Sequence, residues 1–78
     1  MEKSVVMMKD YGHITVKLAA LLKERSLTRN ALAKKIDTRF EVIDRWCKES
    51  MEKIDLEILA RLCYVLDCNV EDILEYKE

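Results

Sequence analysis

The 78-residue chain contains no proline, a single glycine, Gly12, and a single histidine, His13. Hairpins and tight β-turns depend on glycine and proline, because these residues supply the backbone angles that such turns require. Their near absence favours helices joined by short connections. No apolar run approaches the roughly 20 residues of a membrane-spanning helix, and the first residues lack the layout of a signal peptide. We therefore expect a cytoplasmic protein without a membrane partner.

Few residues are available for metal binding or catalysis. The three cysteines, Cys47, Cys63 and Cys68, are odd in number, so we expect reduced thiols rather than a disulfide framework. A zinc site would need cysteine or histidine pairs two to four residues apart, which the chain does not offer. It also lacks a glycine-rich phosphate loop and a Ser-His-Asp set. We expect no enzyme, no metal, no cofactor and no small-molecule substrate.

What the chain does have is charge, unevenly placed. Half of the residues are apolar and 37% are charged, a balance typical of one globular domain. Residues 23–53 hold nine Lys/Arg and six Asp/Glu, whereas residues 54–78 hold two Lys/Arg and seven Asp/Glu. A polyanion would be attracted by the middle of the chain and repelled by its end. A solvated surface with a chance asymmetry explains the charge pattern equally well.

The apolar spacing is helical, and several helix starts carry a chemical signal. The predicted helices cover residues 15–25, 29–36, 39–48, 56–66 and 70–76. Thr28, Asp55 and Asn69 are suited to cap the second, fourth and fifth helices, because their side chains accept backbone N–H bonds. Thr38 and Glu41 have the spacing of a capping box for the third. The predicted fold is a compact, all-α, five-helix domain over residues 14–78, preceded by an N-terminal arm or strand, residues 1–13.

The helical phase also predicts the core. Trp46 shares a face with Ile43, so we expect it to anchor the core rather than to stack on a ligand. The other predicted core residues are Leu18, Leu22, Leu32, Leu59 and Leu62. For residues 5–8, a strand, an unstructured tail and a partner contact are all compatible with the sequence.

Residues 27–36, LTRNALAKKI, and residues 42–46, VIDRW, resemble the helix-turn-helix of the Cro- and lambda-repressor-type family, also called the XRE family. The resemblance extends through residues 53–76 and is strongest to a short, stand-alone subgroup. In this family Ala33 is small because the two helices of the motif cross there. The sequence differs from the usual family pattern at two places. Asp37 stands where the family usually has glycine, and Lys48-Glu49 stands where it often has Asn-Gly.

The resemblance implies a sequence-specific regulator of transcription that binds double-stranded DNA as a homodimer and reads the major groove with the helix at 39–48. Arg45 is the main candidate for base recognition, because a guanidinium can pair with guanine through two hydrogen bonds. Glu41 could accept from a cytosine amine, and Phe40 could contact a thymine methyl. The complete set of candidate DNA-binding residues is Thr28, Arg29, Asn30, Arg39, Phe40, Glu41, Asp44, Arg45, Lys48, Ser50 and Lys53. The dimer contact is expected in the acidic fourth and fifth helices or in the N-terminal segment.

Other interpretations remain open. Glu41 with Arg45, and Asp44 with Lys48, are also spaced as ordinary surface ion pairs of a helix. The acidic residues on this helix favour an alternative function, a helix-turn-helix-fold protein-interaction module, antitoxin-like or a co-regulator, that does not bind DNA. A DNA-binding protein should lose affinity steeply as salt rises, whereas an interaction module should not respond to DNA.

Overall fold

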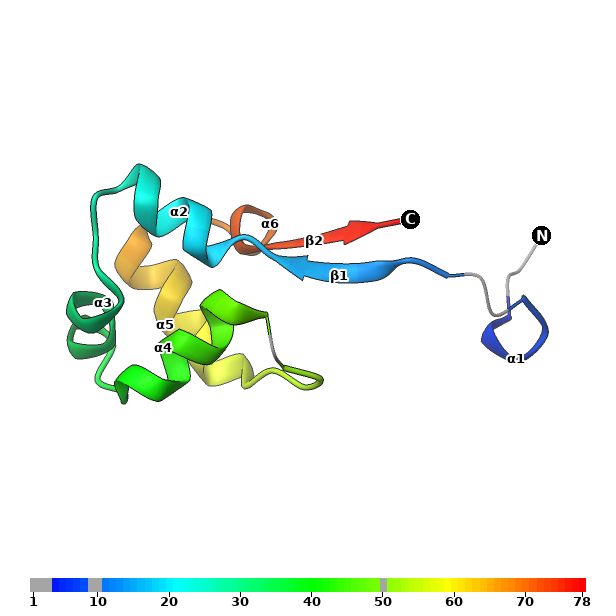
Figure 1. Ribbon diagram of the computed structural model, residues 1–78, viewed down its shortest axis with the longest axis horizontal. Helices are drawn as coiled ribbons and strands as arrows, with labels where there is room; N and C mark the ends of the chain where they lie inside the picture. Colours follow the sequence, from blue (N-terminus) through cyan, green and yellow to red (C-terminus); the bar gives the residue numbers. More distant parts are fainter. Residues whose placement is uncertain (1–3, 9–10, 50) are drawn as a thin grey trace.

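The computed structural model describes residues 4–8, 11–49 and 51–78. Its helices are α1 (Val5–Met8), α2 (Leu18–Glu24), α3 (Arg29–Lys35), α4 (Phe40–Lys48), α5 (Leu56–Leu66) and α6 (Val70–Ile73), and its strands are β1 (His13–Val16) and β2 (Leu74–Lys77). Helices α2 to α6 gather at one end, β1 and β2 run side by side away from them, and α1 lies apart, beyond the strands (Figure 1). The molecule is therefore elongated, with extents of 44 × 20 × 19 Å.

The expectation of an all-α fold is wrong in one respect, because the chain forms a two-stranded antiparallel sheet. The five predicted helices correspond to α2 to α6, but α2 begins at Leu18 rather than at residue 15, and α6 ends at Ile73 rather than at residue 76. The residues left over pair with each other in the register His13–Lys77 to Val16–Leu74. Their backbone groups are satisfied by a strand about 60 residues away in sequence, which local apolar spacing does not reveal.

Two of the predicted helix caps are confirmed in detail. The hydroxyl of Thr28 accepts a hydrogen bond from the N–H of Ala31 at 3.1 Å, and Asp55 Oδ1 accepts from the N–H of Glu57 at 2.8 Å. The capping box at Thr38 is wrong, because Arg39 is the residue that precedes α4 and its side chain makes no capping bond.

Asn69 also precedes α6, as predicted. Its N–H donates to Asp72 Oδ2 at 2.8 Å, so this carboxylate supports the first turn of the helix.

Four helices end on non-glycine residues in the left-handed region, with φ between 50° and 57°: Ser26, Asp37, Glu49 and Asp67. At Asp37 the N–H of Thr38 returns to the carbonyl of Ala33 at 2.9 Å, which closes a Schellman motif between α3 and α4. Aspartate tolerates this conformation better than most residues, so it can stand where the related sequences use glycine.

The core lies between α2, α3, α4 and α5. Trp46 is 2% exposed and Ala33, at the contact of α3 with α4, is 3% exposed. The six other predicted core residues are all buried: Leu18, Leu22, Leu32, Ile43, Leu59 and Leu62. Each large apolar side chain buried in this way contributes about 1.5–3 kcal/mol relative to an exposed one. Ile73 of α6 is also fully buried, which fixes the start of β2 against the helices.

Two hydrogen bonds attach the sheet to the helices. The N–H of Lys17 donates to the carbonyl of Ile73 at 2.6 Å, and the N–H of Val16 donates to Glu49 Oε1 at 3.0 Å. At the other end of β1, a Cβ on Gly12 would lie 1.9 Å from the carbonyl oxygen of Lys77. Glycine is therefore required there by the close approach of the two strands.

None of the described helices is long and apolar enough to cross a membrane. The three cysteines are free, and burial raises the pKa of the Cys47 and Cys68 thiols. The part of the chain that the structure describes contains no group of three or more His, Cys, Asp or Glu placed to hold a metal ion.

Candidate nucleic-acid interface

Helix α4 separates its side chains by polarity. Ile43, Trp46 and Cys47 are buried against the core, whereas Arg45 and Lys48 are exposed on the other side. This division follows from the 3.6-residue period of the helix. The polar side is therefore free of contacts with the core.

An ion-pair cluster joins this side of α4 to the start of α3. Arg29 Nη1 lies 2.6 Å from Asp44 Oδ1, and Lys48 Nζ lies 2.8 Å from Asp44 Oδ2. Hydrogen bonds from Lys48 and Arg29 lower the pKa of the Asp44 carboxyl below its usual 3.8. The carboxylate stays ionised at neutral pH, so it keeps both cationic side chains in place.

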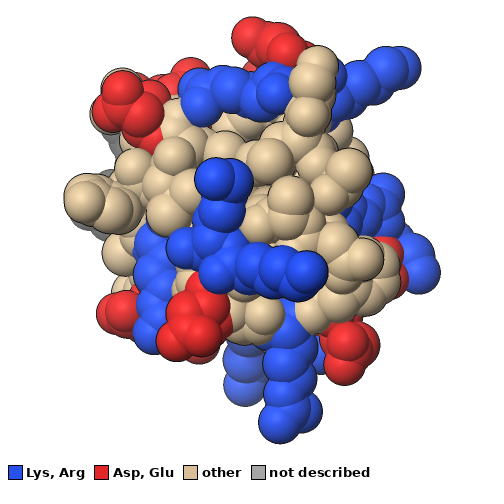
Figure 2. Space-filling model, turned by 90° about the vertical axis from the view of Figure 1, so that its left-hand side faces the viewer, with Lys and Arg blue, Asp and Glu red and all other residues tan. Residues whose placement is uncertain are grey.

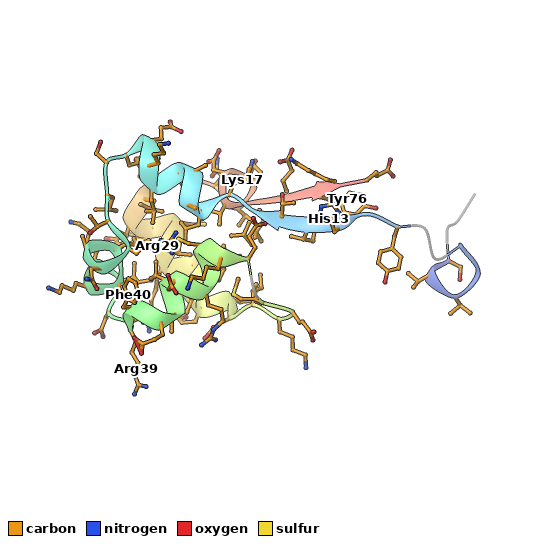
Figure 3. The ribbon with its side chains drawn as sticks, viewed as in Figure 1. His13, Lys17, Arg29, Arg39, Phe40 and Tyr76 are labelled. Atoms are coloured by element: carbon orange, nitrogen blue, oxygen red, sulfur yellow. The ribbon has the colours of Figure 1, made fainter. Side chains whose placement is uncertain are left out.

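The cluster contains three of the candidate DNA-binding residues, Asp44, Arg29 and Lys48, and it gives them different roles. Asp44 is 22% exposed and already binds two cations, so its carboxylate is a positioning group rather than a free hydrogen-bond acceptor for a base. Arg29 and Lys48 remain 39% and 64% exposed, so their outer faces are accessible to a ligand. Figure 3 shows Arg29 between α3 and α4, in agreement with its contact with Asp44.

Arg45 and Glu41 are in a different situation. Both are exposed, and the described part of the structure contains no ion pair between them, although the Asp44–Lys48 pair with the same spacing is formed. The Arg45 guanidinium therefore keeps its hydrogen-bond donors available on the outer side of α4.

The start of α4 carries two more exposed side chains. Arg39 points away from the body of the molecule, and Phe40, at the first position of α4, is 40% exposed (Figure 3). Single apolar side chains with this exposure are common on protein surfaces, so the Phe40 ring is accessible to a ligand but does not by itself indicate one.

The remaining candidates lie on both sides of α4. The hydroxyl of Thr28 is used by its N-cap bond, while Asn30 is exposed beside it at the start of α3. Lys53 is exposed in the connection before α5, and Ser50 lies outside the described residues. Figure 2 shows this end of the molecule, where Lys and Arg side chains occupy the middle and the lower edge and acidic side chains stand beside them.

One residue that positions the motif, Arg61, could not be identified from the sequence. Arg61 of α5 donates to the carbonyls of Ile36 and Asp37 at 3.1 Å and 3.2 Å, and its Nε lies 3.1 Å from Glu57 Oε2. These bonds hold the turn between α3 and α4 against α5. The Glu57–Arg61 spacing predicts a surface ion pair, but it does not reveal the carbonyls, which belong to another part of the chain.

Two solved structures have a similar fold. One is described as a "putative DNA-binding protein from Bacteroides fragilis"; it superposes with a TM-score of 0.71 at 19% identity and covers 81% of this chain and 100% of its own. The other is the transcriptional regulator VanUg, with a TM-score of 0.70 at 21% identity over 97% of both chains. At this level of identity the likeness concerns the fold. No curated protein matches the sequence.

The family comparison covers most of the chain. Residues 17–78 match the family described as the Cro/C1-type HTH DNA-binding domain. The matched region runs from the residue before α2 to the C-terminal strand, so it contains α3, α4 and the turn between them. The chain therefore belongs to the Cro/C1-type helix-turn-helix DNA-binding domain family.

Proposed function

We propose that this protein is a sequence-specific regulator of transcription that inserts α4 into the major groove of double-stranded DNA. The observation that carries this proposal is the polar side of α4, where Arg45 is exposed and unpaired in the described structure while Trp46 anchors the opposite side in the core. A helix with one face fixed and one face free is what insertion into a groove requires.

In this mechanism the residues divide into two roles. Arg45 reads a guanine, with Phe40 and Glu41 as neighbours that contact a thymine methyl or a cytosine amine. Arg29, Asn30 and Lys48 bind phosphates and set the register of the helix, as do Arg39, Ser50 and Lys53. Asp44 does not read a base; it keeps Arg29 and Lys48 oriented.

The proposed regulator works in the cytoplasm. It acts as a homodimer, because one such domain contacts only half of a two-fold symmetric operator. In the proposed regulator, residues 14–78 form the DNA-binding domain and residues 1–13 an N-terminal arm, whose last residue, His13, begins β1.

The test begins with selection of bound duplexes from a random library, followed by titration of the selected operator and of an unrelated duplex. Arg45→Ala is expected to reduce the preference for the operator by about 1–3 kcal/mol, because it removes a base contact and leaves the fold intact. Lys23→Ala, an exposed cation of α2, is the matched control and should leave the preference unchanged. An Arg45→Ala variant with full preference would refute the role of Arg45.

Salt dependence separates this proposal from the alternative of a protein-interaction module. For a protein that releases counterions from DNA, the logarithm of the binding constant falls linearly with the logarithm of the salt concentration. We expect this slope for the wild type and a smaller slope for Lys48→Ala. If no duplex binds at low salt, the interaction module becomes the better explanation.

A further inference from the structure

The C-terminal end of α5 brings two cysteines together. The N–H of Cys68 donates to the carbonyl of Cys63 at 3.0 Å, and the N–H of Asp67 donates to the carbonyl of Tyr64 at 3.3 Å. Asp67 lies in the left-handed region, at φ 50° and ψ 57°, so these two bonds form a Schellman motif. The side chains of the first and last residues of such a motif commonly pack against each other. In this chain both of those residues are cysteines.

The backbone bond also limits the distance between the two cysteines. With standard bond lengths, an N···O distance of 3.0 Å keeps the Cα atoms of Cys63 and Cys68 less than about 7 Å apart. Two cysteines within about 7 Å of each other can be bridged without movement of the backbone. Burial raises the pKa of the Cys68 thiol, and the neighbouring Cys63 thiol raises it further, as expected for two sulfur atoms in close proximity.

The pair at the end of α5 is accessible, in contrast to the third cysteine. Cys63 and Cys68 are half-buried at the edge of the core, and both are free thiols. Cys68 also lines a hollow of about 350 Å³ between α2 and residues 67–72, which include the start of α6. Figure 1 shows α6 beside α2. A small oxidant therefore has room to reach this pair, whereas Cys47 is only 9% exposed on the core side of α4.

We infer that Cys63 and Cys68 form a modification site, at which a hydroperoxide closes an intramolecular disulfide across the end of α5. One thiolate attacks a peroxide oxygen, so that an S–O bond forms, the O–O bond breaks and the alcohol leaves with a proton. The resulting sulfenic acid is attacked by the second thiol, which forms the S–S bond and releases water. The dithiol loses two electrons and two protons, and the hydroperoxide is reduced to an alcohol and water. This site is independent of the proposed function.

The disulfide would join covalently a turn that hydrogen bonds already hold. Arg25 donates to the carbonyl of Leu66 at the end of α5, and Asn69 begins the first turn of α6. The connection from α5 to α6 is thus ordered on both sides of Asp67. A cross-link between residues that are already neighbours restricts the unfolded chain more than the folded one. The oxidised protein is therefore expected to be more stable than the reduced protein.

Peptide mapping identifies the bond. Trypsin cleaves after Arg61 and Lys77, so Cys63 and Cys68 share one peptide, residues 62–77, and Cys47 lies on another, residues 46–48. The folded protein is treated with hydrogen peroxide, and the remaining thiols are alkylated in denaturant. The peptide 62–77 should then carry no alkyl group and lack two hydrogens, whereas Cys47 should be alkylated. Dithiothreitol should restore both alkylation sites, because it reduces a disulfide but not a sulfinic acid.

Thermal unfolding provides a second measurement. Peroxide treatment should raise the midpoint of the wild type by roughly 5–10 °C. Cys47→Ala, the matched control, should show the same rise. Cys63→Ser and Cys68→Ser should show none, because each has one thiol at the turn and cannot close the bond. The inference is overturned if peptide 62–77 keeps both thiols, if the bond forms between copies instead of within one chain, or if oxidation leaves the wild-type midpoint unchanged.

Discussion

The carboxylate of Asp44 holds cationic side chains from two helices, Arg29 from α3 and Lys48 from α4. Their bonds lower its pKa, which means that they stabilise the ionised form. A carboxyl group whose pKa is lower in the folded chain contributes stability above its ordinary pKa. That contribution is lost as the pH falls through the folded value. Asp44 therefore stabilises the folded chain at neutral pH, and this stabilisation is lost at acidic pH.

Asp44→Asn should lower the midpoint of thermal unfolding at pH 7, because it removes the charge that binds both cations. The difference from the wild type should shrink below pH 3.8, where protonation begins to neutralise the native carboxylate as well. Scanning calorimetry between pH 7 and about pH 3 measures this trend. Glu52→Gln, in the exposed connection before α5, is the control. A difference that stays constant with pH would contradict the ion-pair role.

Single residues were predictable where their role is local. Trp46 follows from helical phase, and the caps at Thr28 and Asp55 follow from the residues beside them. The roles of Arg61 and Glu49 were not predictable, because each binds backbone groups that are distant in sequence. The sequence offers several acceptable partners for such side chains, and only the folded arrangement selects one.

At the scale of elements, the residues that end the helices lower the free energy of unfolding. A chain with one glycine closes four helices with left-handed Ser, Asp or Glu residues. Each conformation is less favourable for an L-residue than for glycine. At Asp67 the negative charge also lies at the C-terminus of α5, where the helix dipole disfavours it.

Asp67→Gly is therefore expected to raise the free energy of unfolding by about 0.5–1 kcal/mol, because the relief of both costs outweighs the greater conformational entropy that glycine gives the unfolded chain. Urea titration followed by circular dichroism provides the measurement. Asp67→Ala, which removes the charge but keeps a Cβ in the left-handed region, should be less stable than Asp67→Gly. Equal stability of the two variants would show that backbone strain is not the cause.

The two-stranded sheet is the part of the fold that the sequence did not predict. Thr15 and Val16 come shortly before α2, and Leu74 and Tyr76 follow α6 without a glycine or proline between them, so both segments resemble helix extensions. Their pairing satisfies the backbone across the whole length of the chain. Local patterns cannot register a partner so far away, whereas the helical core and the polar side of α4 are local consequences of periodicity.

At the scale of the whole molecule, charge divides the chain. The basic excess of residues 23–53 includes α3 and α4, and the acidic excess of residues 54–78 includes α5, α6 and β2. A polyanion is attracted to the first region and repelled by the second, which favours one orientation of approach. A net charge of −1 therefore does not argue against DNA as a partner.

The bond between Val16 N–H and Glu49 Oε1 fastens the end of α4 directly to the sheet. Because α4 is held in a fixed position within each copy, the two α4 helices of the proposed homodimer would fit only one spacing of half-sites along the duplex. Adding one base pair between half-sites turns one of them by roughly 35° about the DNA axis. Operators lengthened or shortened by one pair should bind poorly in gel-shift titrations, whereas Glu49→Ala should tolerate them better.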